Sequence, residues 1–385
     1  MNRIYFDNSA TTAVYPEVRE IMLRTLTEDY GNPSSMHMAG VEAEQYMKDA
    51  RRAIAKTLHA KEKEIFFTSG GTESNNWALI GAAMAMKRNG MHIVTSAVEH
   101  PSVSETMKYL EEQGFRVTRV GVDWKGTVDP DMLEAALTPD TVLVSVMYVN
   151  NEVGSVNDPA RIRALINRKC PGAVFHMDAV QAYGKYDIHV GRDGIDLLSA
   201  SGHKIHGPKG IGFLYKKESV RILPFIHGGG QQDGMRSGTD NVPGIAGIGK
   251  AAEIVYAHLA ENRKHLYELS AYLRQQLKKT DGVVLHGPEG EAGAPHIVNA
   301  SFMGVGSEVL LHALEDRGIF VSAGSACSSH KRTKSPTLTA MKCPVSELDS
   351  MIRFSFCESN TKEEIDALLD ALENLLPMLR KYRAR

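Results

Sequence analysis

Short runs of apolar and β-branched residues alternate with helix-like stretches through the first two thirds of the chain, and this alternation limits the possible folds most strongly. The runs typical of strands are 64–68, 92–96, 116–120, 141–149, 174–178, 197–201 and 212–215. Strands that alternate with helices pair mainly in parallel, because each helix carries the chain back to the same end of the sheet. The sequence therefore predicts an α/β fold with a large, mostly parallel sheet.

The last third of the chain has a different pattern. From about Pro243 a helical stretch leads to a compact α+β segment with expected strands at 298–302 and 352–356. We expect residues 14–250 to form the large domain, and residues 1–13 with 251–385 to form a smaller α+β domain. Thr361 and Glu364 have the spacing of a capping box at the start of the last helix, which Pro377 is expected to kink or shorten.

The composition excludes several classes of protein. With 44 basic and 46 acidic residues the formal charge is -2, so no overall field favours nucleic acid or a membrane surface. No apolar run reaches the length of a bilayer span, and the first residues are polar, which predicts a cytoplasmic protein. The four cysteines lack metal-ligand spacing, and we expect Cys170, Cys343 and Cys357 to have no chemical role.

A glycine-rich turn follows the first strand of the expected sheet. It comprises residues 68–76 and leads directly into an Ala-rich helical stretch. Glycines such as Gly71 let backbone N–H groups approach a phosphate, the helix N-terminus adds partial positive charge, and Thr72 offers a hydroxyl. A tight turn with a helix cap is the alternative interpretation, so this turn by itself does not establish a phosphate site.

An acid and a lysine follow two later strands. Asp178 ends an apolar strand, where a protonated pyridine nitrogen would give the carboxylate a partner; the alternative is a cap of the next helix. Lys204 lies among small residues, as a lysine that forms a Schiff base with an aldehyde requires. Ser201 and His203 beside it offer phosphate contacts. Most lysines are solvated surface groups, but the setting of Lys204 favours the cofactor.

His100 and Asn150 each come after a strand, which places them on the same edge of a parallel sheet. The His100 imidazole could stack on a pyridine ring or carry protons, since its ordinary pKa is near neutrality. Asn150 could bind the phenolic oxygen of the cofactor or a substrate carboxylate. An ordinary loop histidine is the alternative for His100.

Taken together, these motifs make the chain resemble the cysteine desulfurases of the class-V aminotransferase group, the NifS-like and IscS-like enzymes. The resemblance extends from end to end and is carried by residues 7–12, 31–35, 68–76, 201–212, 236–239, 324–329 and 352–355. It implies a fold-type I enzyme that depends on pyridoxal 5'-phosphate.

The resemblance also implies a role for each site residue. Lys204 would hold the cofactor covalently, Asp178 would pair with the pyridine nitrogen, and His100 would stack over the ring. Phosphate contacts and ring-oxygen contacts would come from Gly71, Thr72, Ser201, His203, Gln181 and Asn150. Thr239 would reach the phosphate in the neighbouring subunit of a homodimer. Arg353, with Asn150, would bind the carboxylate of L-cysteine, because a guanidinium matches a carboxylate with two hydrogen bonds.

Cys327 distinguishes the resembled enzymes from plain aminotransferases. It lies in a small, polar stretch with four basic residues after it, and such surroundings favour the thiolate. The resemblance implies that Cys327 receives the sulfur of L-cysteine as a persulfide while alanine is released. Cys327 could also ligate an Fe–S cluster transiently; no firm metal site is predicted.

Several alternatives remain open from the sequence. A selenocysteine lyase or a SufS-type desulfurase would use the same cofactor residues, although the stretch around Cys327 favours the NifS and IscS side. A plain aminotransferase would not need this cysteine, and a sulfur-delivery adaptor would not need a complete cofactor site. The acceptor could be an Fe–S scaffold protein or a tRNA-thiolation protein, and direct binding of nucleic acid or a membrane is not expected.

Overall fold

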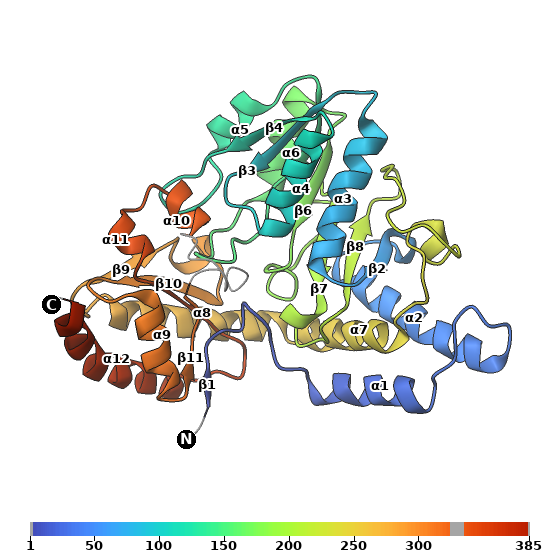
Figure 1. The fold of residues 1–385 in the computed structure, drawn as a ribbon. Helices are drawn as coiled ribbons and strands as arrows, with labels where there is room; N and C mark the ends of the chain where they lie inside the picture. Colours follow the sequence, from blue (N-terminus) through green and yellow to red (C-terminus); the bar gives the residue numbers. More distant parts are fainter. Residues whose placement is uncertain (1–2, 324–334, 384–385) are drawn as a thin grey trace.

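The main sheet has seven strands in the order β2-β8-β7-β6-β5-β3-β4 (Figure 1). The computed structural model describes residues 3–323 and 335–383. The strands are β2 (Ile65–Thr68), β3 (His92–Ser96), β4 (Arg116–Val120), β5 (Thr141–Ser145), β6 (Val174–Asp178), β7 (Leu197–Ser201) and β8 (Gly212–Lys216). Only β8 pairs antiparallel with its neighbours, β2 and β7, while the other pairs are parallel. The predicted α/β fold with a mostly parallel sheet is confirmed.

One strand is shorter than the sequence indicates. We expected it to run to residue 149, but β5 ends at Ser145. The amide of Tyr148 still donates to the Asp178 carbonyl at 2.9 Å, whereas the Tyr148 carbonyl accepts from Asn157 at 2.9 Å. The chain therefore leaves the sheet to form a tight turn directly beside the end of β6.

Twelve α-helices lie in the described ranges, and several cover the faces of the main sheet (Figure 1). They are α1 (Pro16–Thr27), α2 (Met38–Thr57), α3 (Gly71–Met86), α4 (Pro101–Glu112), α5 (Pro130–Ala136), α6 (Pro159–Lys169), α7 (Val242–Ala257), α8 (Leu259–Leu277), α9 (Ser307–Glu315), α10 (Pro336–Ala340), α11 (Val345–Leu348) and α12 (Lys362–Arg383). Five of them begin with proline, which suits the first turn because the amide hydrogen that it lacks would have no partner there.

A second sheet and core are formed mainly by the last third of the chain. Strands β9 (Val283–His286), β10 (Ile297–Phe302) and β12 (Met351–Ser355) are antiparallel, with β10 in the middle, and β1 (Ile4–Tyr5) pairs with β11 (Ile319–Phe320). Phe6 from the N-terminal segment is buried in this core. The division at residue 250 stays a prediction; α7 crosses it without a break, and Val255 packs in the core of the main sheet.

The last helix has the predicted capping box. The Glu364 carboxylate accepts from the Thr361 amide at 3.1 Å, and the Glu364 amide donates to the Thr361 hydroxyl at 3.3 Å. The expectation that Pro377 shortens this helix was wrong, since α12 continues to Arg383. Pro377 lies on the exposed side, where the carbonyl that loses its partner can bind water.

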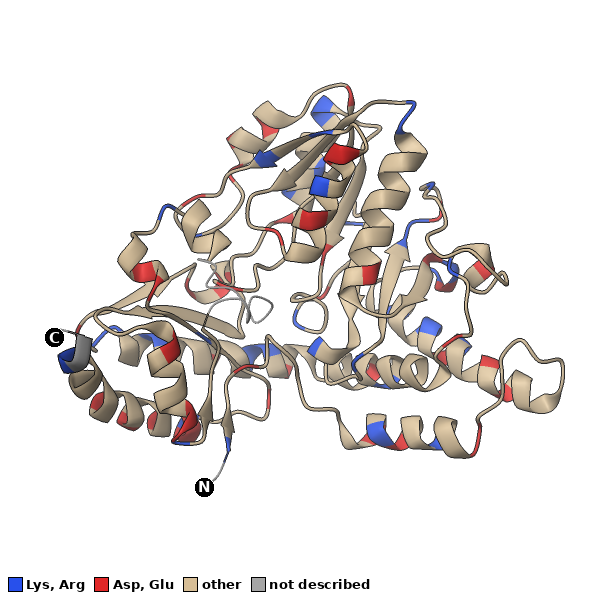
Figure 2. Ribbon diagram, in the orientation of Figure 1, with Lys and Arg blue, Asp and Glu red and all other residues tan. Residues whose placement is uncertain are grey.

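Charge is spread over the molecule. Figure 2 shows basic and acidic positions interspersed along the helices, as in α1, and no face of this view is dominated by one sign. No helix in the described ranges combines the length and the apolar character needed to cross a bilayer.

Candidate active site

A cavity of about 220 Å³ lies where several strands of the main sheet end. Parallel strands place the residues that follow them at one edge of the sheet, where ligands bind in open α/β folds. The cavity is lined by Ser9, Ala10, Gly71, Thr72, Asn75, His100, Ser102, Met147, Val149, Asn151, Asp178, Val180, Gln181, Ser201, His203, Lys204 and Arg353. The structure thus brings together nine of the predicted site residues, from Gly71 to Arg353.

The N-terminus of α3 is one wall of the cavity. Gly70 has a φ of 152°, and a Cβ on Gly71 would lie 2.7 Å from a methyl carbon of Val180. Only glycine fits there without displacing Val180, so the first backbone amides of α3 can approach a ligand closely. Ser201 and His203 line the same cavity, which makes this end of it suitable for a phosphate.

Asp178 is buried at the end of β6, with a relative exposure of 5%. Its carboxylate accepts from the Asn75 side chain at 2.8 Å and from the Val180 amide at 3.0 Å. Within the described ranges, no basic side chain forms an ion pair with it. A buried carboxylate held in this way suits a cationic partner, such as a protonated pyridine nitrogen.

Lys204 follows β7, the strand next to β6, and is part of a short 3-10 helix over Gly202–Lys204. Its ammonium group donates to the backbone carbonyls of Ser9 and Ala10, the latter at 2.7 Å. These carbonyls belong to the N-terminal segment, far away in sequence. Lys204 and Asp178 therefore face one cavity from neighbouring strands, as a cofactor with an aldehyde and a ring nitrogen requires.

Hydrogen bonds connect Asp178 to His100 across the cavity wall. The Asn75 amide group donates to Asp178 and to the Ser102 hydroxyl, each at 2.8 Å. The Ser102 hydroxyl in turn lies 2.9 Å from Nδ1 of His100, and the Ser102 backbone amide donates to the same nitrogen at 3.2 Å. His100 is the N-cap of α4, so its ring is held in place by the start of that helix.

Arg353 is almost completely buried, and its guanidinium is fixed on two sides. One terminal nitrogen donates to the Asn151 carbonyl at 2.7 Å, and the other forms an ion pair with Asp7 at 2.8 Å. Its Nε has no hydrogen-bond partner among the described residues. An oriented guanidinium with an unused donor suits the carboxylate of an amino-acid substrate.

Asn150 does not line the cavity, which corrects the prediction that it contacts the cofactor and substrate. Its amide oxygen accepts from the backbone amides of Glu152 and Val153, both at 2.9 Å, and its amide nitrogen lies 3.2 Å from the Thr337 hydroxyl. Asn150 therefore stabilises the turn after β5. The residue of this turn that lines the cavity is its neighbour, Asn151.

Of the remaining predicted residues, some lie at the cavity and others do not. Gln181 lies at the cavity and donates to the Ser9 carbonyl at 3.0 Å. Burial, together with Lys204 and Lys209, lowers the pKa of His203 to about 4, so its ring is neutral near pH 7. Thr239 is exposed and does not line the cavity, and Cys327 lies outside the described residues.

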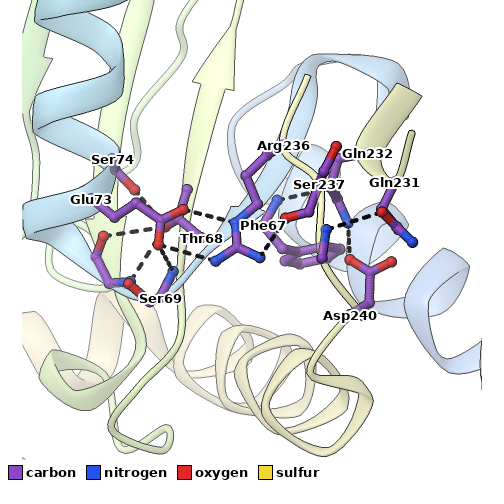
Figure 3. Close-up of polar contacts among 12 residues, drawn as sticks. Phe67, Thr68, Ser69, Glu73, Ser74, Gln231, Gln232, Arg236, Ser237 and Asp240 are labelled. Atoms are coloured by element: carbon purple, nitrogen blue, oxygen red, sulfur yellow. Dashed lines mark hydrogen bonds and ion pairs between the residues drawn. The ribbon is translucent and has the colours of Figure 1, made fainter. Parts of the chain in front are cut away.

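The segment that carries Thr239 is connected to the start of α3. Arg236 forms an ion pair with Glu73 at 2.8 Å, and the Glu73 carboxylate also accepts from the Ser69 amide (Figure 3). Burial raises the pKa of Glu73, but the hydrogen bonds from Arg236 and Ser69 outweigh it, so the pKa lies below its ordinary value. Figure 3 shows Asp240 and Gln232 in contact on the other side of the segment.

The polar atoms of the cavity test whether pyridoxal phosphate fits. Eight buried side-chain atoms have no hydrogen-bond partner among the described residues, and three of them belong to cavity residues: Ser9 Oγ, Asn75 Oδ1 and Arg353 Nε. Such atoms are costly unless a ligand or water satisfies them. With the open amides of α3, the carboxylate of Asp178 and the amine of Lys204, the residues present fit the cofactor.

The sequence reading missed several residues of the site. Asn75, Ser102 and Ser9 are ordinary polar residues, and only their contacts show that they connect Asp178, His100 and Lys204 to one another. Asn75 lies four residues after Gly71 on a helix, so it faces the same side. That spacing was the one signal that could have identified it.

A larger cavity of about 750 Å³ lies elsewhere, beside α2 and α7. Several of its charged residues pair with each other, as in Arg52 with Asp49 and Lys250 with Glu253. None of the predicted site residues lines it. The smaller cavity is therefore the candidate active site.

Glu99, next to His100, gives a prediction about pH and stability. Burial raises its pKa to about 8, and one of its oxygens has no partner among the described residues. The unfolded state loses the Glu99 proton near the ordinary glutamate pKa of 4.5, whereas the folded state keeps it to about 8. Stability should therefore fall as pH rises across this window, by on the order of 2 to 5 kcal/mol.

The Glu99→Gln variant should remove this part of the pH dependence, because glutamine stays neutral. Urea unfolding from pH 5 to pH 8.5 should show a flatter curve for the variant than for the wild type. Glu112→Gln, at an exposed position, is the matched control and should follow the wild type. Parallel curves for Glu99→Gln and wild type would contradict the raised pKa.

The chain is similar to known proteins over nearly its whole length. The class-V aminotransferase family matches residues 4–368. A NifS/IcsS protein homolog of Lactobacillus delbrueckii subsp. bulgaricus is 43% identical over 374 residues, which are 97% of each chain. A protein of Dictyoglomus turgidum named cysteine desulfurase IscS is also 43% identical, over 98% of this chain and 95% of its own.

Solved structures resemble the chain over nearly its whole length. A structure described as a NifS-like protein has a TM-score of 0.93 and 40% identity, and it covers 98% of this chain and 100% of its own. A structure titled "SspA in complex with cysteine" has a TM-score of 0.80 and 33% identity over 94% of this chain and 100% of its own. These likenesses confirm the fold-type I architecture. The chain belongs to the class-V aminotransferase family.

Proposed function

We propose that the protein is a pyridoxal-phosphate-dependent cysteine desulfurase, which converts L-cysteine to L-alanine and transfers the sulfur to Cys327 as a persulfide. The observation that carries the proposal is the position of Lys204 and Asp178, which line one cavity from neighbouring parallel strands beside the N-terminus of α3. Relatives named cysteine desulfurase and the structure titled with cysteine support the choice of substrate.

The bound cofactor would supply an electron sink for the substrate carbon. The side chains of the cavity would do the rest. Lys204 would hold the cofactor by its aldehyde, and its amine would move the proton of the substrate Cα. Asp178 would keep a proton on the ring nitrogen, and the amides of Gly71 and Thr72, with Ser201 and His203, would bind the phosphate.

Other residues position the substrate. Arg353 binds the carboxylate of L-cysteine, with Nε as the free donor and Asp7 fixing the guanidinium. We assign the assisting amide to Asn151 in place of Asn150. His100, held by Ser102, would cover the ring of the cofactor, and Gln181, held by the Ser9 carbonyl, would lie near the ring oxygen.

The sulfur step then uses Cys327. Its thiolate attacks the sulfur of the substrate, an S–S bond forms as the substrate C–S bond breaks, and the carbon takes up a proton to become alanine. The persulfide passes to an acceptor, which we propose to be an Fe–S scaffold or a tRNA-thiolation protein. The cytoplasmic location and a transient cluster-ligand role of Cys327 stay predictions.

The active unit that we propose is a homodimer. Six of the large exposed apolar side chains lie between residues 23 and 41: Leu23, Leu26, Tyr30, Met36, Met38 and Val41. This apolar segment covers the end of α1 and the start of α2, at one end of the molecule (Figure 1). Exposed apolar surface concentrated in this way is typical of an interface. Thr239, exposed and away from its own cavity, would serve the cavity of the partner.

Product analysis tests the proposed reaction. We expect purified enzyme with L-cysteine to release alanine, and one persulfide to appear on the peptide that contains Cys327, as measured by mass spectrometry before any reductant is added. A plain aminotransferase would instead yield a keto acid and would need an amino acceptor. Alanine without a protein persulfide, or a persulfide on Cys343 alone, would contradict the proposal.

A further inference from the structure

Outside the active site, three potential metal ligands converge beside the second sheet. His286 ends β9, Cys343 lies between α10 and α11, and Glu347 is in α11. One ligand atom of each residue lies within 4.8 Å of the others. Nδ1 of His286 is 3.9 Å from the Cys343 sulfur and 3.9 Å from a Glu347 oxygen. Three elements distant in sequence therefore supply one imidazole, one thiol and one carboxylate.

The hydrogen bonds of Ser301 determine which His286 nitrogen can bind an ion. The Ser301 hydroxyl donates its hydrogen to the Glu347 carbonyl at 2.7 Å, so it can only accept from Nε2 of His286, which lies 2.7 Å away. Nε2 therefore carries the ring hydrogen, and Nδ1 keeps its lone pair toward the sulfur and the carboxylate. A metal-binding histidine is usually held by such a contact on its other nitrogen.

The environment agrees with a ligand role for these groups. Burial, with Arg274, lowers the pKa of His286 to about 4, so the ring is neutral near pH 7. The side chain of His286 is 4% exposed and that of Glu347 is 18% exposed, so an ion could enter from the Glu347 side. The nearby Arg274 opposes a cation, but thiolate and carboxylate together carry two negative charges against it.

We propose that His286, Cys343 and Glu347 bind a zinc ion, with water as the fourth ligand. Zinc prefers this combination of sulfur, nitrogen and oxygen in tetrahedral geometry. With Zn–S of about 2.3 Å and Zn–N of about 2.0 Å, the ligand atoms would be about 3.3 to 3.5 Å apart, so closure needs shifts on the order of 0.5 to 1 Å. Because zinc binds a thiolate, binding should release the thiol proton of Cys343.

A second cluster of His, Cys and Glu side chains differs from this one in the partners of its carboxylate. His206, Cys357 and Glu358 also lie within 4.8 Å of one another. There, however, the Tyr15 hydroxyl donates to Glu358, and Nε2 of His206 lies 3.2 Å from the other oxygen of this carboxylate. The carboxylate is thus engaged by a hydroxyl and an imidazole, and Cys357 is a suitable control position.

The zinc ion would join β9 to the α10–α11 connection. That connection follows residues 324–334 closely in sequence, the stretch that contains Cys327. Ser335 and Thr337, at the start of α10, already donate to the buried Glu152. Zinc would attach this part of the chain at a second point. The zinc concentration would then determine how firmly the segment after Cys327 is held.

Zinc binding to the holoenzyme tests the proposal, in a Cys327→Ser background that removes the catalytic thiol as a competing ligand. We expect one zinc per chain after dialysis, measured by elemental analysis, and X-ray absorption showing one sulfur at about 2.3 Å. Cys343→Ala should weaken binding at least 100-fold, and Ser301→Ala, which frees Nε2 of His286, about 10-fold. Cys357→Ala should bind zinc as the background does.

Any other outcome would contradict the proposed zinc site. Absence of zinc from the background protein, or zinc without a sulfur ligand, would overturn the proposal. So would equal zinc affinity in the Cys343→Ala variant. Thermal unfolding with and without zinc guards against misfolding: zinc should raise Tm in the background and in Cys357→Ala, but not in Cys343→Ala, whose Tm without zinc should stay near that of the background.

Discussion

Lys204→Ala is expected to lower kcat/KM for alanine formation from L-cysteine at least about 10³-fold, because it removes both the covalent attachment of the cofactor and the base for the Cα proton. The structure gives the reason for so large an effect. The lysine amine is held by two backbone carbonyls in the cavity, and Asp178 lies on the neighbouring strand. No other lysine lines the cavity within the described ranges.

The matched control for this variant is Lys209→Ala, which changes an exposed lysine of the same segment. It should keep activity within a few-fold of the wild type. Mass spectrometry after borohydride reduction should find the cofactor on the Lys204 peptide of the wild type and Lys209→Ala, and on no peptide of Lys204→Ala. Cofactor fixed to another lysine in Lys204→Ala would contradict the assignment.

Cys327→Ser should abolish persulfide formation while leaving cofactor attachment to Lys204 intact. A serine hydroxyl is a far weaker nucleophile than a thiolate, and it cannot form the S–S bond that holds the sulfur. We expect the variant to form alanine at less than about 1% of the wild-type rate. Each tenfold loss of rate corresponds to about 1.36 kcal/mol of activation free energy. Absorbance of the bound cofactor should still change on addition of L-cysteine, because substrate binding uses other residues.

Cys170→Ala is the control for the sulfur step, since Cys170 is buried and lies at the end of α6. It should form the persulfide at the wild-type rate. If Cys327→Ser still produced a protein persulfide, another cysteine would be the acceptor, and the mechanism proposed for the sulfur step would be wrong. The two variants thus separate the cofactor half of the proposal from the sulfur half.

The fold was largely predictable because its strands are short, apolar and bounded by polar residues. Runs such as 92–96 and 174–178 match the observed β3 and β6 residue for residue. The end of β5 was not predictable, since Tyr148 and its neighbours are as apolar as a strand, and only the turn that follows takes them out of the sheet. That α12 continues past Pro377 was not predictable, because the sequence does not show that this proline faces solvent.

Site residues were predictable where the residue type has one characteristic chemical role. They were less predictable where the side chain can also serve a structural role. Lys204 and Asp178 could be found because each follows a strand of the same sheet. The pair Asn150 and Asn151 could not be resolved, because adjacent side chains in a turn point in different directions and only the hydrogen bonds show which is used internally. Cys343, expected to have no chemical role, became notable only through its neighbours His286 and Glu347.

The contacts of His100 also decide the direction in which it can move a proton. Its Nδ1 accepts from the Ser102 backbone amide, so in the neutral ring the hydrogen is on Nε2. Nε2 then offers a hydrogen and not a lone pair. A substrate that arrives as a thiolate would find a hydrogen-bond donor there, whereas a thiol would first need to lose its proton elsewhere. We therefore expect neutral His100 to donate a hydrogen bond during turnover rather than to remove the proton of the incoming cysteine.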